Sequence, residues 1–126
     1  MIHLDTSVLI DALSGPKRSA RRLRGIIERG ERVGLASVVL YEWLRGPRLP
    51  EELAAQEALF PREAAVPFGF EEAALAADLY RALGRPRGRE IDLVVAACAL
   101  THGAALWTLN ARDFRDVANL ALFVPE

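Results

Sequence analysis

Four acidic residues stand where a carboxylate needs an explanation. Asp5 follows the short apolar stretch IHL, and Glu42 lies within SVVLYEWLRG, where most neighbours are apolar. Asp92 opens the apolar run DLVVAACAL, and Asp113 lies in TLNARDF near the end of the sequence. Burying a carboxylate without a partner is costly, so acids in such surroundings usually have a charge partner or a metal ion beside them.

These carboxylates, taken as one set, suit a particular chemistry. Hard oxygen ligands prefer Mg²⁺ or Mn²⁺, and no network of histidine and cysteine accompanies them in the sequence. Carboxylates crowded together repel one another unless a cation lies between them. One or two such ions would activate water and stabilise charge on a phosphoryl group, so we expect phosphodiester hydrolysis.

Each acid also has an ordinary structural explanation. Asp5 can cap the N-terminus of a helix, and Asp92 can interact favourably with the dipole of a helix that it begins. Glu42 can be one polar position on an amphipathic helix, and Asp113 can be a solvated carboxylate in a turn. No single residue decides between structure and chemistry, so the argument depends on where the fold places all four.

The pattern along the chain alternates strands and helices. Apolar periodicity and breakers such as Ser14-Gly15-Pro16 predict these elements. We expect strands at 2–4, 33–36, 64–67, 105–109 and 120–124, and helices at 7–13, 17–29, 38–44, 50–60, 70–83 and 90–102. This alternation favours a parallel sheet covered by helices on both faces.

The predicted strands place several polar residues at one edge of the sheet. Asp5 comes directly after the first strand, and Asn110 and Asp113 follow the strand at 105–109. Ligand sites in open parallel sheets form beyond the carboxyl ends of the strands. We therefore expect these residues to lie at the functional site.

Length and composition describe an ordinary small domain. The 126 residues suit one domain covering 1–126, and the 52% hydrophobic fraction is enough for one core. No stretch approaches the roughly 18 to 20 apolar residues of a membrane span. Cys98 is the single cysteine, and the N-terminus has no basic region of a signal peptide, so we expect a cytoplasmic location.

Charge is distributed unevenly although the net charge is only −1. Residues 17–32 carry a local net charge of +5, and residues 49–80 carry −6. The loop GRPRGR lies directly before Asp92, so Arg85, Arg87 and Arg89 are candidate contacts for substrate phosphates near the metal. The alternative is a solvated flexible loop. The basic helix at 17–29 is a further candidate contact.

Other residues that often do chemistry have simpler roles here. His3 lies between apolar residues of a strand, and His102 ends a helix, with no histidine or cysteine at metal-binding spacing from either. Cys98 lies between alanines on an apolar helix, which is typical of a core position. Trp43 is expected to lie in the core rather than in a partner groove.

Taken together, the four blocks HLDTSVLID, SVVLYEWLRG, REIDLVVAACAL and TLNARDF resemble the PIN-domain nucleases. Within these nucleases the chain is similar to the VapC-type toxins of bacterial toxin–antitoxin pairs, over essentially its whole length. Each block is a weak motif alone, but their order in a chain of this size is specific. The resemblance implies a three-layer α/β/α sandwich with a five-stranded parallel sheet and the acids meeting in one cleft.

The resemblance also implies roles for the site residues. Asp5 and Asp92 would bind Mg²⁺ or Mn²⁺ directly, and Asp113 would complete the shell directly or through water. Glu42 would hold a water or a second metal ion, or help to activate the nucleophile. Hydrogen bonds within the site are expected from Thr6, Ser7 and Asn110. Many family members have an aspartate where Asn110 stands, which puts a stable second ion in doubt.

The same resemblance implies partners. Proteins of this type usually form homodimers and bind a small antitoxin whose tail blocks the cleft. The implied function is an endoribonuclease toxin that inhibits translation.

Two alternatives remain: a PIN-like module that binds RNA or protein without cutting, and a phospho-acceptor receiver. The full set of acids argues against the first, and the absence of any lysine beyond Lys17 argues against the second.

Overall fold

Three short parallel strands form the centre of the protein. In the computed structural model, which describes residues 1–125, β1 (Ile2–Leu4) lies between β2 (Val33–Gly34) and β3 (Ala105–Trp107). Ile2 pairs with Val33 on one side and with Ala105 on the other, and both pairings are parallel. All three residues of β1 are buried, as expected for a central strand covered on both faces.

The expected five-stranded sheet is only partly present. Within residues 1–125, the predicted outer strands at 64–67 and 120–124 are reduced to single parallel bridges, Ala36 with Val66 and Leu106 with Leu122. Pro67 directly follows Val66 and has no backbone N–H, so pairing cannot continue regularly there. The outer segments follow the direction of the sheet but extend it by one residue pair each.

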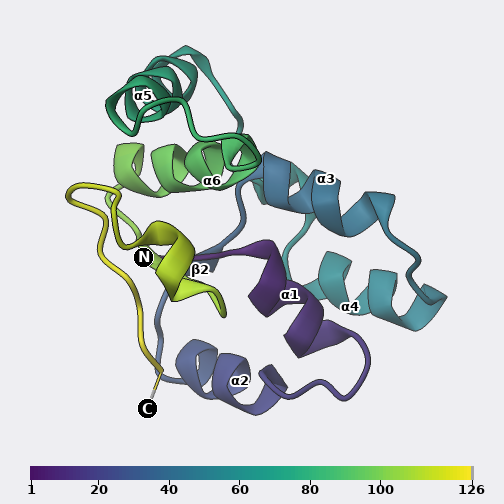
Figure 1. Ribbon diagram of the computed structural model, residues 1–126. Coiled ribbons are helices and arrows are strands. Elements are labelled where there is room, and N and C mark those ends of the chain that lie inside the picture. Colours follow the sequence, from purple (N-terminus) through teal and green to yellow (C-terminus); the bar gives the residue numbers. More distant parts are fainter. Residues whose placement is uncertain (126) are drawn as a thin grey trace.

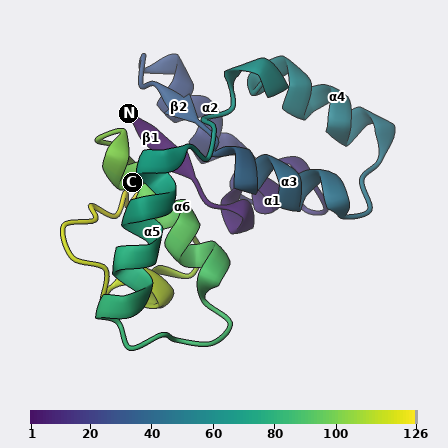
Figure 2. The ribbon, with the colours of Figure 1, turned by 90° about the horizontal axis from the view of Figure 1, so that it is seen from above.

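Six α-helices surround the sheet. Figures 1 and 2 show α5 and α6 side by side, with the other four helices grouped around the opposite part of the sheet. Short 3-10 helices, η1 (Arg62–Ala64) and η2 (Ala111–Phe114), complete the described elements. The α-helices are α1 (Thr6–Leu13), α2 (Ala20–Glu28), α3 (Ser37–Arg45), α4 (Pro50–Leu59), α5 (Phe70–Ala82) and α6 (Glu90–Thr101).

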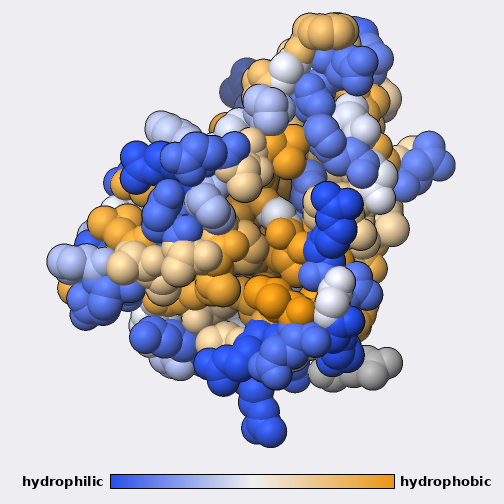
Figure 3. Space-filling model, turned by 180° about the vertical axis from the view of Figure 1, so that it is seen from behind, coloured by the Kyte–Doolittle hydropathy of each residue, from blue (hydrophilic) through white to orange (hydrophobic). Residues whose placement is uncertain are grey.

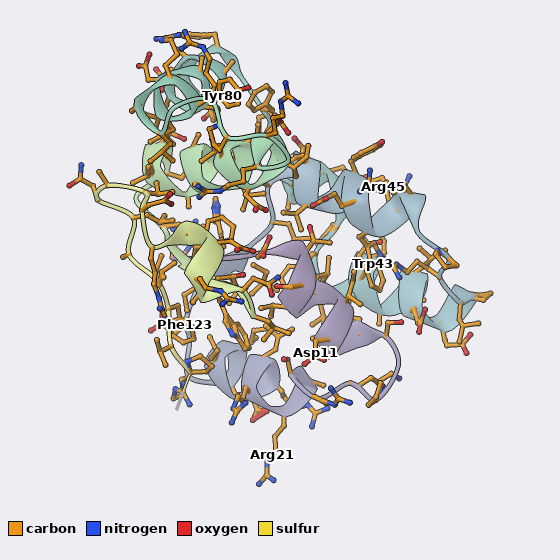
Figure 4. All side chains as sticks on the ribbon, viewed as in Figure 1. Asp11, Arg21, Trp43, Arg45, Tyr80 and Phe123 are labelled. Atoms are coloured by element: carbon orange, nitrogen blue, oxygen red, sulfur yellow. The ribbon has the colours of Figure 1, made fainter. Side chains whose placement is uncertain are left out.

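The predicted helix at 17–29 starts three residues later than expected. Lys17 has a backbone φ of 55°, which a helix does not allow, and α2 therefore begins at Ala20 after a turn. Leu23 and Ile26 face the core, whereas the arginines lie outside, so α2 is amphipathic with a basic outer face. Figure 4 shows Arg21 pointing away from the body of the molecule.

The core explains why α6 is apolar on nearly every side. This helix packs between α5, α3 and β3, and its alanines at 96, 97 and 99 are fully buried. Small side chains allow a helix to approach several neighbours closely. Trp43 is buried, as predicted, and its side chain lies between α3 and α4 (Figure 4), and Trp107 is buried as well. No helix within residues 1–125 is long and apolar enough to span a membrane.

The fold brings two strand ends together. The backbone N–H of Asp5, just past β1, donates to the carbonyl oxygen of Trp107, the last residue of β3, at 2.9 Å. Asp5 and the segment that begins at Thr108 therefore leave the sheet side by side. This is the edge at which the polar residues were expected.

Candidate active site

Asp5 joins the end of β1 to the start of α1. Its Oδ1 accepts from the backbone N–H of Thr6 at 2.9 Å, so the predicted helix-capping role is real. Its Oδ2 accepts from two hydroxyls, Ser7 Oγ at 3.1 Å and Thr108 Oγ1 at 2.7 Å. The residue is only 6% exposed, and three donors orient its carboxylate. Capping and chemistry are compatible here, because the donors fix the carboxylate at the strand edge.

Thr108 is a member of the site that the sequence interpretation missed. Besides its bond to Asp5, its Oγ1 accepts from the backbone N–H of Asn110 at 3.0 Å. Ser7 Oγ in turn accepts from the backbone N–H of Leu109 at 3.1 Å. These bonds tie the segment after β3 to the start of α1. The sequence prediction places Thr108 inside a strand at 105–109, whereas β3 ends at Trp107, so Thr108 is the first residue after the strand.

Glu42 is directed to the same region from α3. Thr6 Oγ1 donates to its Oε1 at 2.5 Å, which links α3 to the residue next to Asp5. On its other side, Arg45 lies 3.4 Å from Oε2, and the Arg45 guanidinium also lies over the ring of Tyr41 at 5.3 Å. The Glu42 side chain is 19% exposed, whereas the next residue, Trp43, is fully buried. Glu42 thus lies at the edge of the core, and Thr6 and Arg45 hold its carboxylate.

Asp92 shows that the acids share one electrostatic environment. Burial in the first turn of α6 is the largest cause that raises the pKa of Asp92, to about 6. The charges of Asp5 and Asp113 raise this pKa further, Glu42 adds a smaller effect, and Arg89 opposes them. Such mutual repulsion requires proximity. The other three acids, although far from Asp92 in the sequence, are therefore near enough in space for their charges to affect its pKa.

Asp113 lies on η2, the short helix that follows β3. It is exposed, and its backbone N–H donates to the carbonyl oxygen of Asn110 at 2.9 Å. Asn110 contributes to the site network through its backbone, since its N–H donates to Thr108. The backbone carbonyl oxygen of Asp113 accepts from Arg89 at 2.6 Å. Asp113 therefore approaches the other acids from the β3 side of the site.

Comparison with known proteins places this arrangement in a family. The profile of the PIN domain matches residues 2–120, nearly the whole chain.

The chain belongs to the PIN-domain family.

Among curated relatives of this PIN domain are VapC ribonucleases. The present chain is 32% identical over 120 residues to ribonuclease VapC19 of Mycobacterium tuberculosis, and the match covers 88% of this chain and 90% of the relative. It is 41% identical over 59 residues to ribonuclease VapC1 of Rickettsia felis, covering 44% and 42% of the two chains. The relatives that match along most of the chain are therefore enzymes of the PIN nuclease family.

Solved structures share the fold of this PIN domain. The DNA-bound VapBC of Salmonella typhimurium superposes with a TM-score of 0.78 at 22% identity, covering 97% of this chain and 96% of that one. FitAcB of Neisseria gonorrhoeae gives 0.71 at 23% identity, covering 99% and 98%. At these identities the likeness establishes the fold.

The donor set of this PIN domain fits a small divalent cation. Carboxylate and hydroxyl oxygens are the groups that Mg²⁺ and Mn²⁺ prefer. Burial first, and then the charges of Asp5 and Asp113, raise the pKa of Asp92, and a bound cation would offset the charge effect. Within residues 1–125, no three acidic, histidine or cysteine side chains already lie close enough together to hold a metal ion. Because Mg²⁺ usually keeps several waters, a few carboxylates are sufficient.

The three arginines of the GRPRGR loop differ in their surroundings. Arg85 and Arg87 are exposed, the surroundings expected of candidate phosphate contacts. The Arg89 side chain is 25% exposed and bonds to both carboxylate oxygens of Asp116 at 2.7 Å. This pairing raises the pKa of Arg89 and lowers that of Asp116. The guanidinium of Arg89 is thus already engaged by the protein.

The two histidines and the cysteine lie away from this network. His102 Nε2 is 3.1 Å from Oε2 of the buried Glu72, which joins the end of α6 to the start of α5. The His3 ring lies 6.0 Å from that of His102, and burial is the main reason that its pKa falls to about 4. Burial also raises the pKa of the Cys98 thiol to about 11, which keeps it protonated at neutral pH. These are structural positions.

Proposed function

We propose that this chain is a Mg²⁺- or Mn²⁺-dependent endoribonuclease that hydrolyses RNA phosphodiester bonds. We further propose that it is the toxin of a VapBC-type pair and inhibits translation by cutting RNA in the cytoplasm. The observation that carries the proposal is the hydrogen-bond network at the ends of β1 and β3, in which Ser7 and Thr108 donate to Asp5, and Thr6 donates to Glu42. The ribonuclease names of its curated relatives support the same activity.

The proposed roles follow from the position of each side chain. Asp5 and Asp92 hold the cation, and Asp113 completes its shell directly or through water. When bound, the cation supplies an activated water and neutralises charge on the phosphoryl oxygens. Ser7 and Thr108 hold the Asp5 carboxylate in place through Oδ2. Such supporting bonds orient ligands and tune a metal site.

Glu42 is proposed to act beside the cation. Thr6 holds its Oε1, and Arg45 lies near Oε2, so its carboxylate has a fixed direction. From this place it holds the nucleophilic water or a second ion. Asn110 stands where many family members carry another acid, so one ion is favoured over two. Arg85 and Arg87 are proposed to contact phosphates of the RNA on either side of the cut.

A small antitoxin is the proposed protein partner, alongside a second copy of the chain in a homodimer. VapBC2 of Rickettsia felis and a Klebsiella pneumoniae toxin–antitoxin complex share the fold of this chain. A groove of about 330 Å³ lies between α1, α2 and α4, and an adjoining hollow lies beside β2; Leu59 lines both. Figure 3 shows apolar side chains gathered in a hollow that hydrophilic ones surround. An amphipathic helix of the antitoxin would bury such a surface.

The nuclease proposal is tested by incubating the purified chain with a mixed RNA pool in Mg²⁺, Mn²⁺ or EDTA. Asp5→Asn removes one carboxylate charge from the site, and Asp78→Asn does the same on the exposed face of α5. We expect metal-dependent cleavage by wild type and by Asp78→Asn, and none by Asp5→Asn. RNA binding without cleavage in either metal would instead identify a binding module. Cleavage that persists in Asp5→Asn would refute the assigned site.

A further inference from the structure

Arg89 connects the start of α6 to the segment that carries Asp113. Its Nη1 and Nη2 donate to the two carboxylate oxygens of Asp116, both at 2.7 Å. Nη2 also donates to the backbone carbonyl oxygen of Asp113 at 2.6 Å. A planar guanidinium that binds both oxygens of a carboxylate fixes direction as well as distance. One side chain therefore holds the η2 segment against the first turn of the helix that carries Asp92.

The surroundings of Arg89 differ from those of a surface ion pair. Its Nε is buried and has no hydrogen-bond partner within residues 1–125. Asp92 and Asp113 lie near enough for their charges to raise its pKa, in addition to the larger effect of Asp116. The Arg89 guanidinium thus lies partly buried beside the candidate site, with its Nε–H donor unpaired among the residues that the structure describes. That cost indicates a role beyond a solvated loop residue.

The η2 segment has a clear need for such a contact. It is a single 3-10 helix of four residues with no side-chain hydrogen bond at its N-terminal cap, Asn110. Phe114 and Val117 anchor it from the core side, where both are buried. Asp113 itself is exposed. The hydrogen bond from Arg89 Nη2 to the Asp113 carbonyl oxygen adds a polar contact to these two apolar ones.

We propose that Arg89 is a positioning residue that acts with Asp116 as a clamp on η2, and so fixes Asp113 for cation binding. This inference rests on the proposed nuclease function, since it requires Asp113 to belong to the cation site. Arg89 then contacts neither the cation nor the RNA, but acts through Asp113. The clamp replaces the expectation that Arg89 is free to bind phosphates.

A simple charge effect makes the opposite prediction, which allows a decisive test. Arg89→Gln removes a positive charge beside several carboxylates, so electrostatics alone would tighten Mn²⁺ binding. Loss of the clamp would weaken it, because a ligand freed from its supporting bond typically costs about ten- to a hundredfold in metal affinity. Arg89→Lys keeps the charge but loses the two-point grip. The clamp predicts weaker binding there too, whereas charge alone predicts no change.

The experiment measures Mn²⁺ affinity of the purified full chain by the electron paramagnetic resonance signal of free Mn²⁺. Wild type is compared with Arg89→Gln, Arg89→Lys, Asp116→Asn and the Arg89→Gln/Asp116→Asn double variant. Arg81→Gln is the matched control, because Arg81 pairs with Asp78 on the exposed face of α5. Melting temperatures without metal establish that each variant is folded.

The clamp predicts about ten- to hundredfold weaker Mn²⁺ binding in each Arg89 variant and in Asp116→Asn. The double variant should be no worse than either single one, and Arg81→Gln should match wild type. Unchanged or tighter binding in Arg89→Gln, or wild-type affinity in Arg89→Lys, would overturn the clamp alone. If wild type neither binds Mn²⁺ nor cuts RNA, the proposed function and the clamp are both wrong.

Discussion

Thr108 Oγ1 donates a 2.7 Å hydrogen bond to Oδ2 of Asp5, although 103 positions separate the two residues in the sequence. Parallel pairing of β1 with β3 brings them together, because each residue comes directly after its strand. The sheet thus determines the position of an acid, and the residue after the neighbouring strand determines its orientation. Activity should therefore depend on this hydroxyl as well as on the carboxylates.

Thr108→Val tests this dependence, since valine keeps the shape of threonine and removes the hydroxyl. We expect RNA cleavage to fall about ten- to a hundredfold, as is typical when a supporting bond to a metal ligand is lost. Thr108→Ser restores the donor and should recover most of the activity. Single-turnover cleavage rates measure the effect. Equal rates for the valine and serine variants would show that the bond to Asp5 has no functional weight.

The raised pKa of Asp92 predicts how stability varies with pH. The pKa of Asp92 is about 6 in the folded protein, whereas in the unfolded chain it is near its usual value of 3.8. The folded state holds more protons between these values, so the contribution of Asp92 to stability decreases as pH rises through this window. Asp92→Asn should therefore melt at a higher temperature than wild type at pH 7 without metal, and this difference should shrink as the pH falls to 4.

Differential scanning fluorimetry from pH 4 to pH 8 measures this difference. Asp78→Asn, on an exposed face, should follow wild type across the range. Mn²⁺ should raise the wild-type melting temperature at pH 7 and leave Asp92→Asn nearly unchanged, because a ligand that binds only the folded state stabilises it. A lower melting temperature for Asp92→Asn at pH 7 without metal would contradict the repulsion among the acids.

His3 predicts the opposite slope with pH. Its pKa falls from 6.5 to about 4 in the folded protein, so the unfolded chain binds more protons between these values. Stability should therefore rise with pH through this window. Both ring nitrogens are buried and lack a partner within residues 1–125. His3→Leu should add about 1–3 kcal/mol to the free energy of unfolding at pH 5.

Urea denaturation at pH 5 and pH 8 measures the His3 effect. The gain in the free energy of unfolding from His3→Leu should be larger at pH 5 than at pH 8. At pH 5 the His3 ring is protonated in the unfolded wild type and must lose this proton on folding, whereas at pH 8 it is neutral in both states. His102→Gln is a useful companion, since it changes the neighbouring ring without altering the buried one. A gain that is equal at both pH values would mean that His3 does not titrate as its burial requires.

Much of the fold follows from local sequence pattern. The Ser14-Gly15-Pro16 breaker, the apolar face of residues 23–26 and the apolar α6 each specify their own element. Asp5 could be placed at the strand edge because strand and cap signals coincide there. The outer strands were overestimated, because apolar residues at 64–67 and 120–124 do not reveal that only one residue pair on each side is bonded.

The unpredicted parts of the site depend on distant partners. Arg89 looks like its neighbours in the GRPRGR loop, and only the folded chain brings Asp116 to it from 27 positions away. Thr108 is one of several hydroxyls in the sequence, and its bond to Asp5 exists because β1 and β3 are adjacent. Local pattern predicts which elements form, whereas tertiary pairing decides which side chains meet.

In the proposed site, Asp5 and Asp92 hold a divalent cation at the end of the sheet. The most direct measurement is a crystal of the chain grown with Mn²⁺ and analysed by anomalous diffraction. We expect a manganese peak within about 2.5 Å of carboxylate oxygens of both residues, and no peak there in Asp5→Asn. A wild-type crystal with no peak between these carboxylates, or with manganese bound only elsewhere, would contradict it.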